Sequence, residues 1–234
     1  MLPMREIVFD TETTGLDPRS GDRMVEIGCI ELFNLIPTGA TFHAYFNPER
    51  DMPPGAEAVH GLSRAFLADK PLFHELAEEL LAFLGDSPLI AHNAGFDFAF
   101  LNAELGVCAR DAVCTSRMVD TVALAKKRHP GAKLSLDALC TRYGIDRSHR
   151  VRHGALLDAE LLAQVYVELR GGRQIGLELA ADRALGIAES EIATITPRRP
   201  VERPRREPRP HTATPAERER HRIFIAGIQS PLWG

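Results

Sequence analysis

Apolar and polar residues alternate in three stretches near the N-terminus, a pattern typical of strands that bury one face. The stretches are residues 7–9, 24–33 and 41–46, and segments rich in turn-forming residues, 15–18 and 35–39, separate them. Consecutive strands with short connections favour antiparallel pairing, because parallel strands need a longer crossover. We therefore predict an antiparallel meander at the start of the chain.

The middle of the chain changes to the three- and four-residue spacing of apolar positions that is typical of amphipathic helices. Helices are predicted over residues 72–84, 96–105, 119–127, 134–143 and 155–170, and a short buried strand is predicted over 89–91. Strands that are followed by helices and a further strand indicate an α/β domain with a mixed sheet.

The composition changes after Thr196. Between residues 197 and 222 the chain holds six prolines and nine arginines, which predicts an extended, solvated linker instead of a packed element. The last twelve residues, 223–234, carry no charge and contain the only tryptophan, Trp233. This tail is too short to fold alone, so we expect it either to bind a partner or to pack onto its own domain.

The overall composition favours a cytoplasmic, soluble protein. Its 234 residues are 44% hydrophobic and 26% charged, and no apolar run is long enough to span a membrane or to act as a secretory signal. The four cysteines lack the spacing of a zinc site. The net charge is −4, but residues 1–197 hold 19 basic and 28 acidic residues. A body this acidic is not expected to hold duplex DNA by itself.

Two carboxylates lie at the end of the first predicted strand. Asp10 and Glu12 are two residues apart, so they share a face and repel each other unless they share a proton or bind a cation. Acidic residues are also ordinary at a strand end that leads into a turn, so this pair alone leaves both interpretations open.

Two further acids lie on helix faces that are otherwise apolar. Asp97 shares a face with Phe100, and Asp158 is in line with Leu161 and Val165. Unpaired carboxylates are rarely buried, because their desolvation is costly. A metal ion, an arginine or the N-terminus of its helix would each stabilise Asp158.

Carboxylates without cysteine or histidine ligands favour a hard cation such as Mg²⁺ or Mn²⁺ over zinc. A pair of such ions, about 3.5–4 Å apart, can hold the attacking and leaving oxygens of a displacement at phosphorus. His153, five residues before Asp158, is close enough in the sequence to reach the same cleft and to take a proton from water. These residues therefore favour metal-assisted hydrolysis of a phosphodiester.

Three segments resemble the motifs of the DEDDh 3′–5′ exonucleases, in that family's order and at its approximate spacing. They are DTETTGL at residues 10–16, HNAGFDFAFL at 92–101 and HGALLDA at 153–159. Within the family, the chain is most similar to the proofreading (epsilon) subunits of bacterial DNA polymerase III. The segment AVHGLS at 58–63 resembles the substrate-binding loop of that group.

The resemblance implies a ribonuclease-H-like exonuclease fold, in which helices flank a mixed five-stranded sheet and a flexible C-terminal extension follows. It implies that two divalent ions, Mg²⁺ or Mn²⁺, bind Asp10, Glu12, Asp97 and Asp158, with His153 as the general base. For His60 and His92, a hydrogen-bonded structural role is the alternative interpretation. The residues implied to contact the 3′ end of single-stranded DNA are Asp10, Glu12, Thr13, Leu16, His60, His92, Asn93, Phe96 and Asp158.

The resemblance also divides the chain into an exonuclease domain over 1–172, a post-domain segment over 173–196, the linker over 197–222 and the tail over 223–234. The tail, through Phe224 and Trp233, would bind the catalytic (alpha) subunit of DNA polymerase III.

The post-domain segment resembles a sliding-clamp-binding motif at Gln174, Leu177 and Leu179, but it lacks the motif's final aromatic residue. A simple linker is therefore the alternative interpretation of this segment. The clamp and a small theta-like subunit are further partners that the resemblance suggests, and a membrane is not expected.

Two other functions are weighed against a proofreading exonuclease. A stand-alone DEDDh exonuclease in RNA trimming or DNA repair would use the same catalytic residues, but it has no need of a tethered anchor. A non-catalytic bridge between polymerase and clamp has no use for four convergent carboxylates and a histidine.

Overall fold

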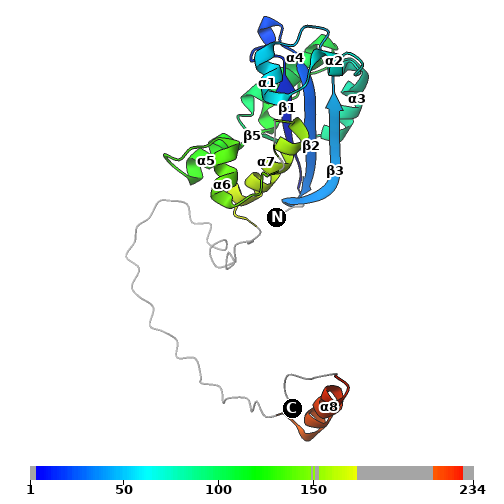
Figure 1. Cartoon of the computed structure of the whole chain (residues 1–234), viewed down its shortest axis with the longest axis vertical. Coiled ribbons are helices and arrows are strands. Elements are labelled where there is room, and N and C mark those ends of the chain that lie inside the picture. The colour runs from blue at the N-terminus through cyan, green and yellow to red at the C-terminus, as the bar shows by residue number, and fades with distance from the viewer. Residues whose placement is uncertain (1–3, 149, 151–152, 173–212, 229–234) are drawn as a thin grey trace, which may run out of the picture. The chain divides into compact units, whose positions relative to one another are not determined.

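The computed structural model describes residues 4–148, 150, 153–172 and 213–228. A five-stranded sheet with the strand order β3-β2-β1-β4-β5 forms its centre (Figure 1). β1 pairs antiparallel with β2 and β2 with β3, whereas β4 is parallel to β1 and β5 to β4. The predicted meander and mixed sheet are confirmed. The strands are β1 (Arg5–Thr13), β2 (Met24–Phe33), β3 (Ile36–Tyr45), β4 (Leu89–Ala91) and β5 (Met118–Asp120).

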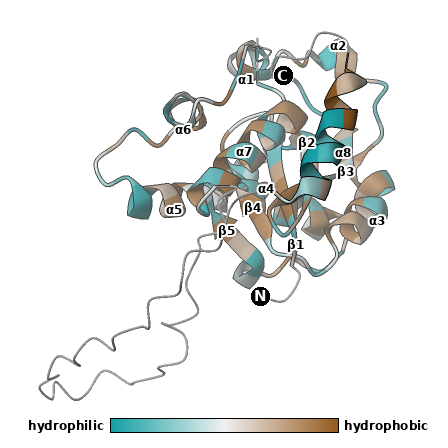
Figure 2. Ribbon diagram, turned by 90° about the horizontal axis from the view of Figure 1, so that it is seen from below, coloured by the Kyte–Doolittle hydropathy of each residue, from teal (hydrophilic) through white to brown (hydrophobic). Residues whose placement is uncertain are grey.

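Helices pack on both faces of this sheet, because alternate residues of β1 point to opposite sides. Ile7 and Phe9 share a buried cluster with α3 and α4, whereas Val8 shares one with α5, α6 and α7. Figure 2 shows the hydrophobic character of the central strands between these helices. The helices of this unit are α1 (Pro54–His60), α2 (Arg64–Leu67), α3 (Phe73–Leu84), α4 (Gly95–Val107), α5 (Thr121–Arg128), α6 (Leu136–Tyr143) and α7 (Ala155–Leu169).

Several element boundaries differ from the sequence-based expectation, and the reason is clearest at β3 and α5. The turn between β2 and β3 needs only Asn34 and Leu35, with positive φ angles of 51° and 65°, so β3 begins earlier than predicted. The helix predicted over 119–127 begins only after Asp120, which ends β5. The Asp120 side chain accepts the N–H of Val122 and so caps α5.

The expectation of an extended linker is wrong for residues 215–222, which lie in helix α8 (Pro215–Ala226). Thr214 and Glu217 cap the start of α8 reciprocally, and Pro215 occupies the first helical turn, where its missing N–H costs nothing. Residues 197–212 of the predicted linker lie outside the described residues.

The chain divides into two compact units, of which the first holds β1 to α7 and the second holds α8. No helix in the described part of the chain is long and apolar enough to cross a membrane.

Candidate active site

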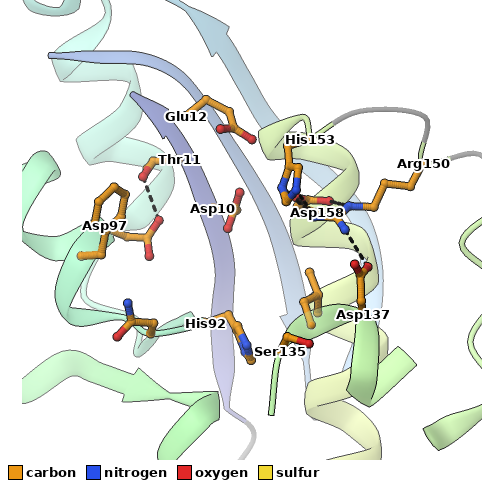
Figure 3. Close-up of a pocket in the computed structure, with 13 residues that line it drawn as sticks. Asp10, Thr11, Glu12, His92, Asp97, Ser135, Asp137, Arg150, His153 and Asp158 are labelled. Atoms are coloured by element: carbon orange, nitrogen blue, oxygen red, sulfur yellow. Dashed lines mark hydrogen bonds and ion pairs between the residues drawn. The ribbon is translucent and has the colours of Figure 1, made fainter. Parts of the chain in front are cut away.

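A cavity of about 280 Å³ opens between the end of β1, the start of α4 and the start of α7 (Figure 3). The start of α6 and the segment before α7 complete its wall. All four predicted metal-ligating carboxylates and the predicted general base line this one cavity. The lining residues are Asp10, Thr11, Glu12, His92, Asn93, Phe96, Asp97, Ser135, Leu136, Asp137, Arg150, His153 and Asp158.

Asp10 and Glu12 come from alternate positions of β1, as their spacing predicts. Burial raises the pKa of Asp10 well above its ordinary value, and the charges of Asp97 and Glu12 raise it further. Burial also raises the pKa of Glu12 to about 8, with further contributions from Asp158 and Glu26. Carboxylates with pKa values raised in this way bind protons unless a cation compensates their negative charge.

Asp97 lies in the first turn of α4, with only 3% of its surface exposed. The hydroxyl of Thr11, between the two acidic positions of β1, donates a hydrogen bond of 2.8 Å to Oδ1 of Asp97. Burial raises the pKa of Asp97 to about 7, although the Thr11 hydrogen bond acts in the opposite direction. Thr11 therefore joins β1 to α4 and fixes the orientation of a carboxylate that is costly to bury.

Asp158 lies in the first turn of α7 and is also 3% exposed. Its neighbours on the helix, Leu161 and Val165, belong to the core, which confirms that Asp158 occupies an apolar stripe. Of the stabilising partners that the sequence allows, an arginine is present. Arg150 Nε donates to Oδ1 of Asp158 at 2.5 Å, and Nη2 donates to Oδ2 at 2.6 Å.

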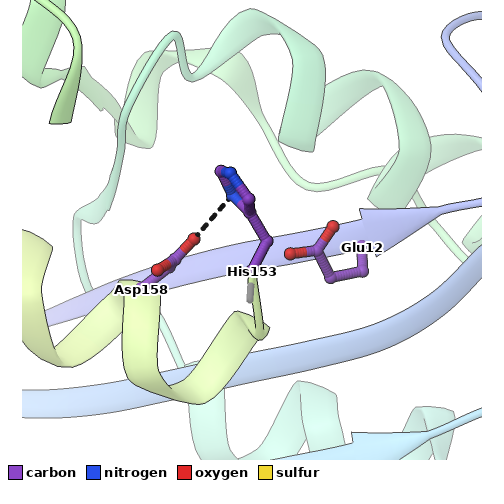
Figure 4. Close-up of side chains that lie close together, drawn as sticks. All are labelled: Glu12, His153 and Asp158. Carbon is purple, nitrogen blue, oxygen red and sulfur yellow. Dashed lines mark hydrogen bonds and ion pairs between the residues drawn. The ribbon is translucent and has the colours of Figure 1, made fainter. Parts of the chain in front are cut away.

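His153 lies beside the same carboxylate, with Nδ1 at 3.1 Å from Oδ2 of Asp158 (Figure 4). Glu12, His153 and Asp158 each offer a ligand atom, and these atoms all lie within 4.8 Å of one another. The His153 side chain is about half exposed, so water and substrate can reach it. Its backbone N–H donates to the carbonyl of Val59 at 3.4 Å, which joins it to the predicted substrate-binding loop.

The donor set fits a hard divalent cation. The carboxylates of Asp10, Glu12, Asp97 and Asp158 are oxygen ligands, which Mg²⁺ and Mn²⁺ prefer. Burial and neighbouring acids raise the pKa values of Asp10, Glu12 and Asp97, and a bound cation would lower them.

His92 and Asn93, in the connection from β4 to α4, and Phe96, in the first turn of α4, also line the cavity. The ring of His92 contacts the hydroxyl of Thr121, with 2.9 Å between Nδ1 and Oγ1, and burial lowers its pKa. Asn93 has a φ of 62°, and its N–H donates to Asp120 at 3.1 Å, which fixes this connection. These contacts fix the positions of His92 and Asn93 beside the cavity.

The comparisons with known proteins agree with this geometry. A family profile described as "Exonuclease" matches residues 7–166. The chain is 54% identical to DNA polymerase III subunit epsilon of Rickettsia felis, over 76% of this chain and 80% of the relative. It is 44% identical to DNA polymerase III subunit epsilon of Escherichia coli K12, over 72% of each. The chain belongs to the exonuclease family, among the DNA polymerase III epsilon subunits. It is a 3′–5′ exonuclease.

Solved structures of other exonucleases share its fold. A structure of exonuclease X in complex with 5′ overhanging duplex DNA superposes with a TM-score of 0.55 and is 26% identical, covering 70% of this chain and 89% of that one. The nuclease domain of 3′hExo, a DEDDh family member bound to rAMP, has a TM-score of 0.63 at 16% identity and covers 72% and 92%. At 16% identity, the similarity to the 3′hExo nuclease domain shows a shared fold only.

Three of the residues expected to bind substrate in the exonuclease lie outside the lining of the cavity. Leu16 is 84% exposed, and Thr13 and His60 are buried. His60 Nδ1 accepts the N–H of Leu62 at 3.0 Å, as a structural histidine would. Their contact with a nucleotide therefore stays a prediction.

The predicted partner-binding residues of the exonuclease are mostly beyond the described part of the chain. Gln174, Leu177, Leu179 and Trp233 lie outside the described residues. Phe224 lies in α8 and is 67% exposed.

Sequence reasoning missed Thr11 and Arg150 as parts of the site. Thr11 stands between the two acidic positions of β1, and a buried threonine next to a carboxylate is a common hydrogen-bond donor. Arg150 is three residues before His153, but the sequence shows no periodicity that would aim it at Asp158.

Proposed function

We propose that this exonuclease proofreads DNA synthesis: it hydrolyses the last phosphodiester of a mispaired, single-stranded 3′ end and releases a nucleoside 5′-monophosphate. The observation that carries the proposal is the convergence of Asp10, Glu12, Asp97 and Asp158 on one cavity with His153 at its rim. Buried acids with raised pKa values are typical of functional sites.

The four carboxylates would hold two divalent ions, Mg²⁺ or Mn²⁺, which when bound stabilise the negative charge that develops on the phosphate oxygens. The chain contributes the positions of the ligands. Thr11 orients Asp97 through its 2.8 Å hydrogen bond, and the first turn of α7 presents Asp158 to the acids of β1. The exposed imidazole of His153 would take the proton of the attacking water.

The remaining wall would hold the terminal nucleotide. His60, His92, Asn93 and the backbone at Thr13 would steady this nucleotide through polar groups. The exposed Leu16 and the ring of Phe96 would pack on its base. Extrusion of the end is easiest for a mispaired nucleotide, because it has already lost its pairing energy.

The relatives' names place them in DNA polymerase III, and we propose that this chain works in the same complex in the cytoplasm. The segment after residue 172 would bind the sliding clamp weakly through Gln174, Leu177 and Leu179, and a theta-like subunit would bind the exonuclease domain. The tail would bind the alpha subunit through Phe224 and Trp233. In support, Ile223 and Phe224 are 61% and 67% exposed at the end of α8. A tether would then concentrate the acidic domain near the primer end.

The reaction is tested with the full chain on a primer–template that carries a labelled, mispaired 3′ nucleotide, in the presence of Mg²⁺. We expect the labelled 3′ nucleotide to be the first product, released as a nucleoside 5′-monophosphate. A correctly paired 3′ end should release its nucleotide more slowly. Release of the 5′-terminal nucleotide, or of nucleoside 3′-monophosphates, would contradict the proposed reaction.

The tether is tested separately by co-elution with the alpha subunit. A chain that ends at Thr196 should hydrolyse single-stranded DNA normally but not co-elute with alpha, and Trp233→Ala should weaken binding by about 2 kcal/mol or more if Trp233 is an anchor. Co-elution of the truncated chain would instead favour a binding surface on the exonuclease domain.

A further inference from the structure

Arg150 occupies both carboxylate oxygens of Asp158 (Figure 3). The two charge-assisted hydrogen bonds, of 2.5 and 2.6 Å, run in parallel from Nε and Nη2, the geometry in which arginine binds carboxylates most strongly. Nη1 donates to Oδ1 of Asp137 at 2.7 Å, and only 9% of the Arg150 side chain is exposed. A cation that used Asp158 as a ligand would compete with Arg150 for these oxygens.

The same guanidinium also contacts the predicted general base. Nη2 of Arg150 lies 2.7 Å from Nδ1 of His153. Arginine has only donors, so a hydrogen bond from Nη2 makes Nδ1 the acceptor. Arg150 therefore contacts both the carboxylate of Asp158 and the ring of His153.

We infer that Arg150 and a divalent cation compete for Asp158, and that cation binding moves Arg150 away from both Asp158 and the ring of His153. This inference rests on the proposed function, because it uses Asp158 as a metal ligand. Cation binding and repositioning of the His153 ring are then a single event.

The charges around the cavity support this exchange. Arg150 is the group whose charge lowers the pKa values of Asp10 and Glu12, against burial and the neighbouring acids. It therefore supplies part of the compensation that a metal ion would supply. Asp137, at the start of α6, accepts from Nη1 of Arg150, whereas Asp158 accepts from Nε and Nη2. The arginine therefore keeps the Asp137 contact when Asp158 binds a cation.

A permanent structural ion pair between Arg150 and Asp158 is the competing explanation, and unfolding of the full chain separates the two. Arg150→Lys keeps the charge but removes the parallel hydrogen bonds. We expect the variant to have a lower unfolding midpoint than the parent in EDTA, and this difference to disappear at saturating Mn²⁺. A difference of the same size in both conditions would mean that the pair persists with metal bound, and would overturn the inference.

Arg147 offers a matched control, since it also donates to Asp137, at 2.9 Å, but lies outside the lining of the cavity. By calorimetry, Mn²⁺ should bind Arg150→Lys roughly fivefold to tenfold more tightly than the parent, because the variant spends less time in the occluded state. Arg147→Lys should bind Mn²⁺ like the parent. Equal affinities for the parent and Arg150→Lys would refute the competition, whereas a parent that binds no Mn²⁺ would refute the proposed metal site as well.

The surroundings of His153 are followed by nitrogen NMR of the imidazole rings, with His153→Gln used for assignment. Diamagnetic Mg²⁺ should shift the His153 ring resonances as Arg150 leaves the ring. A ring that does not respond to Mg²⁺ would contradict the inference.

Discussion

Gly28 of β2 lies directly against the backbone of Leu156 in α7. A Cβ atom at Gly28 would lie 2.3 Å from both the Cα and the N of Leu156, far inside any permitted contact. Gly28 is also the antiparallel partner of Asp10 in β1. The missing side chain thus lets the first turn of α7, which carries Asp158, approach the strand that carries Asp10.

Gly28→Ala should therefore impair both stability and catalysis. The clash is with backbone atoms, so no side-chain rotation relieves it, and we expect a loss of about 1–3 kcal/mol in the free energy of unfolding. Urea unfolding and hydrolysis of a single-stranded oligonucleotide measure the two effects. Gly106→Ala in α4 is the control, because its Cβ would meet nothing within 4 Å and alanine favours a helix. Normal activity in Gly28→Ala would show that α7 can shift without harm.

Asp10→Asn should abolish hydrolysis while making the metal-free protein more stable. The substitution keeps the shape of the side chain but removes a charge that Asp97 and Glu12 repel. Activity is measured at saturating Mg²⁺ and the unfolding midpoint in EDTA, with Glu160→Gln on the exposed face of α7 as the control. Activity within a few-fold of the parent would refute the role of Asp10 as a metal ligand.

The stability of the metal-free protein should fall as the pH rises from about 4 to 8. The folded-state pKa values of Asp97 and Glu12 are raised to about 7 and about 8, so the folded state binds more protons than the unfolded state in this range. Its stability therefore decreases until these groups have ionised. Unfolding midpoints in EDTA across this range test the slope, and Mn²⁺ should reverse the loss at pH 8.

Asp97→Asn provides the matched variant for this slope, because its Oδ1 can still accept from Thr11. The histidines His60 and His92, whose pKa values burial lowers, act in the opposite direction, and they are the same in both proteins. The parent should lose more stability than Asp97→Asn between pH 4 and 8. Parallel profiles would mean that Asp97 is ionised throughout.

His153→Gln should lower the hydrolysis rate by roughly 10²–10⁴-fold, the usual contribution of a general base. The variant should still bind Mn²⁺, because the proposed ligands are the four carboxylates. Calorimetry of Mn²⁺ binding is therefore measured beside the rate. If the variant loses Mn²⁺ binding, His153 is a ligand, as its position near Glu12 and Asp158 would also allow.

Local patterns in the sequence were enough to find the carboxylates. The two-residue period of a strand puts Asp10 and Glu12 on one face, and the helical period puts Asp97 and Asp158 in apolar stripes. The structure places these four side chains in one cavity. The boundaries of the elements were harder to predict from the sequence. β5 has only three residues, and their pattern also suits the helix that follows. The capping pair that starts α8 is visible in the sequence, but the prolines before it favour an extended chain.

The sequence by itself determined the chemistry of the site, because residue types and short-range periodicity decide which groups can be buried on one face of a strand or helix. Only the tertiary structure decided which groups meet across elements. Arg150 contacts Asp158 and His153, and Gly28 of β2 lies against the backbone of α7. Neither contact produces a periodic pattern in the sequence, because each depends on how the fold brings separate elements together.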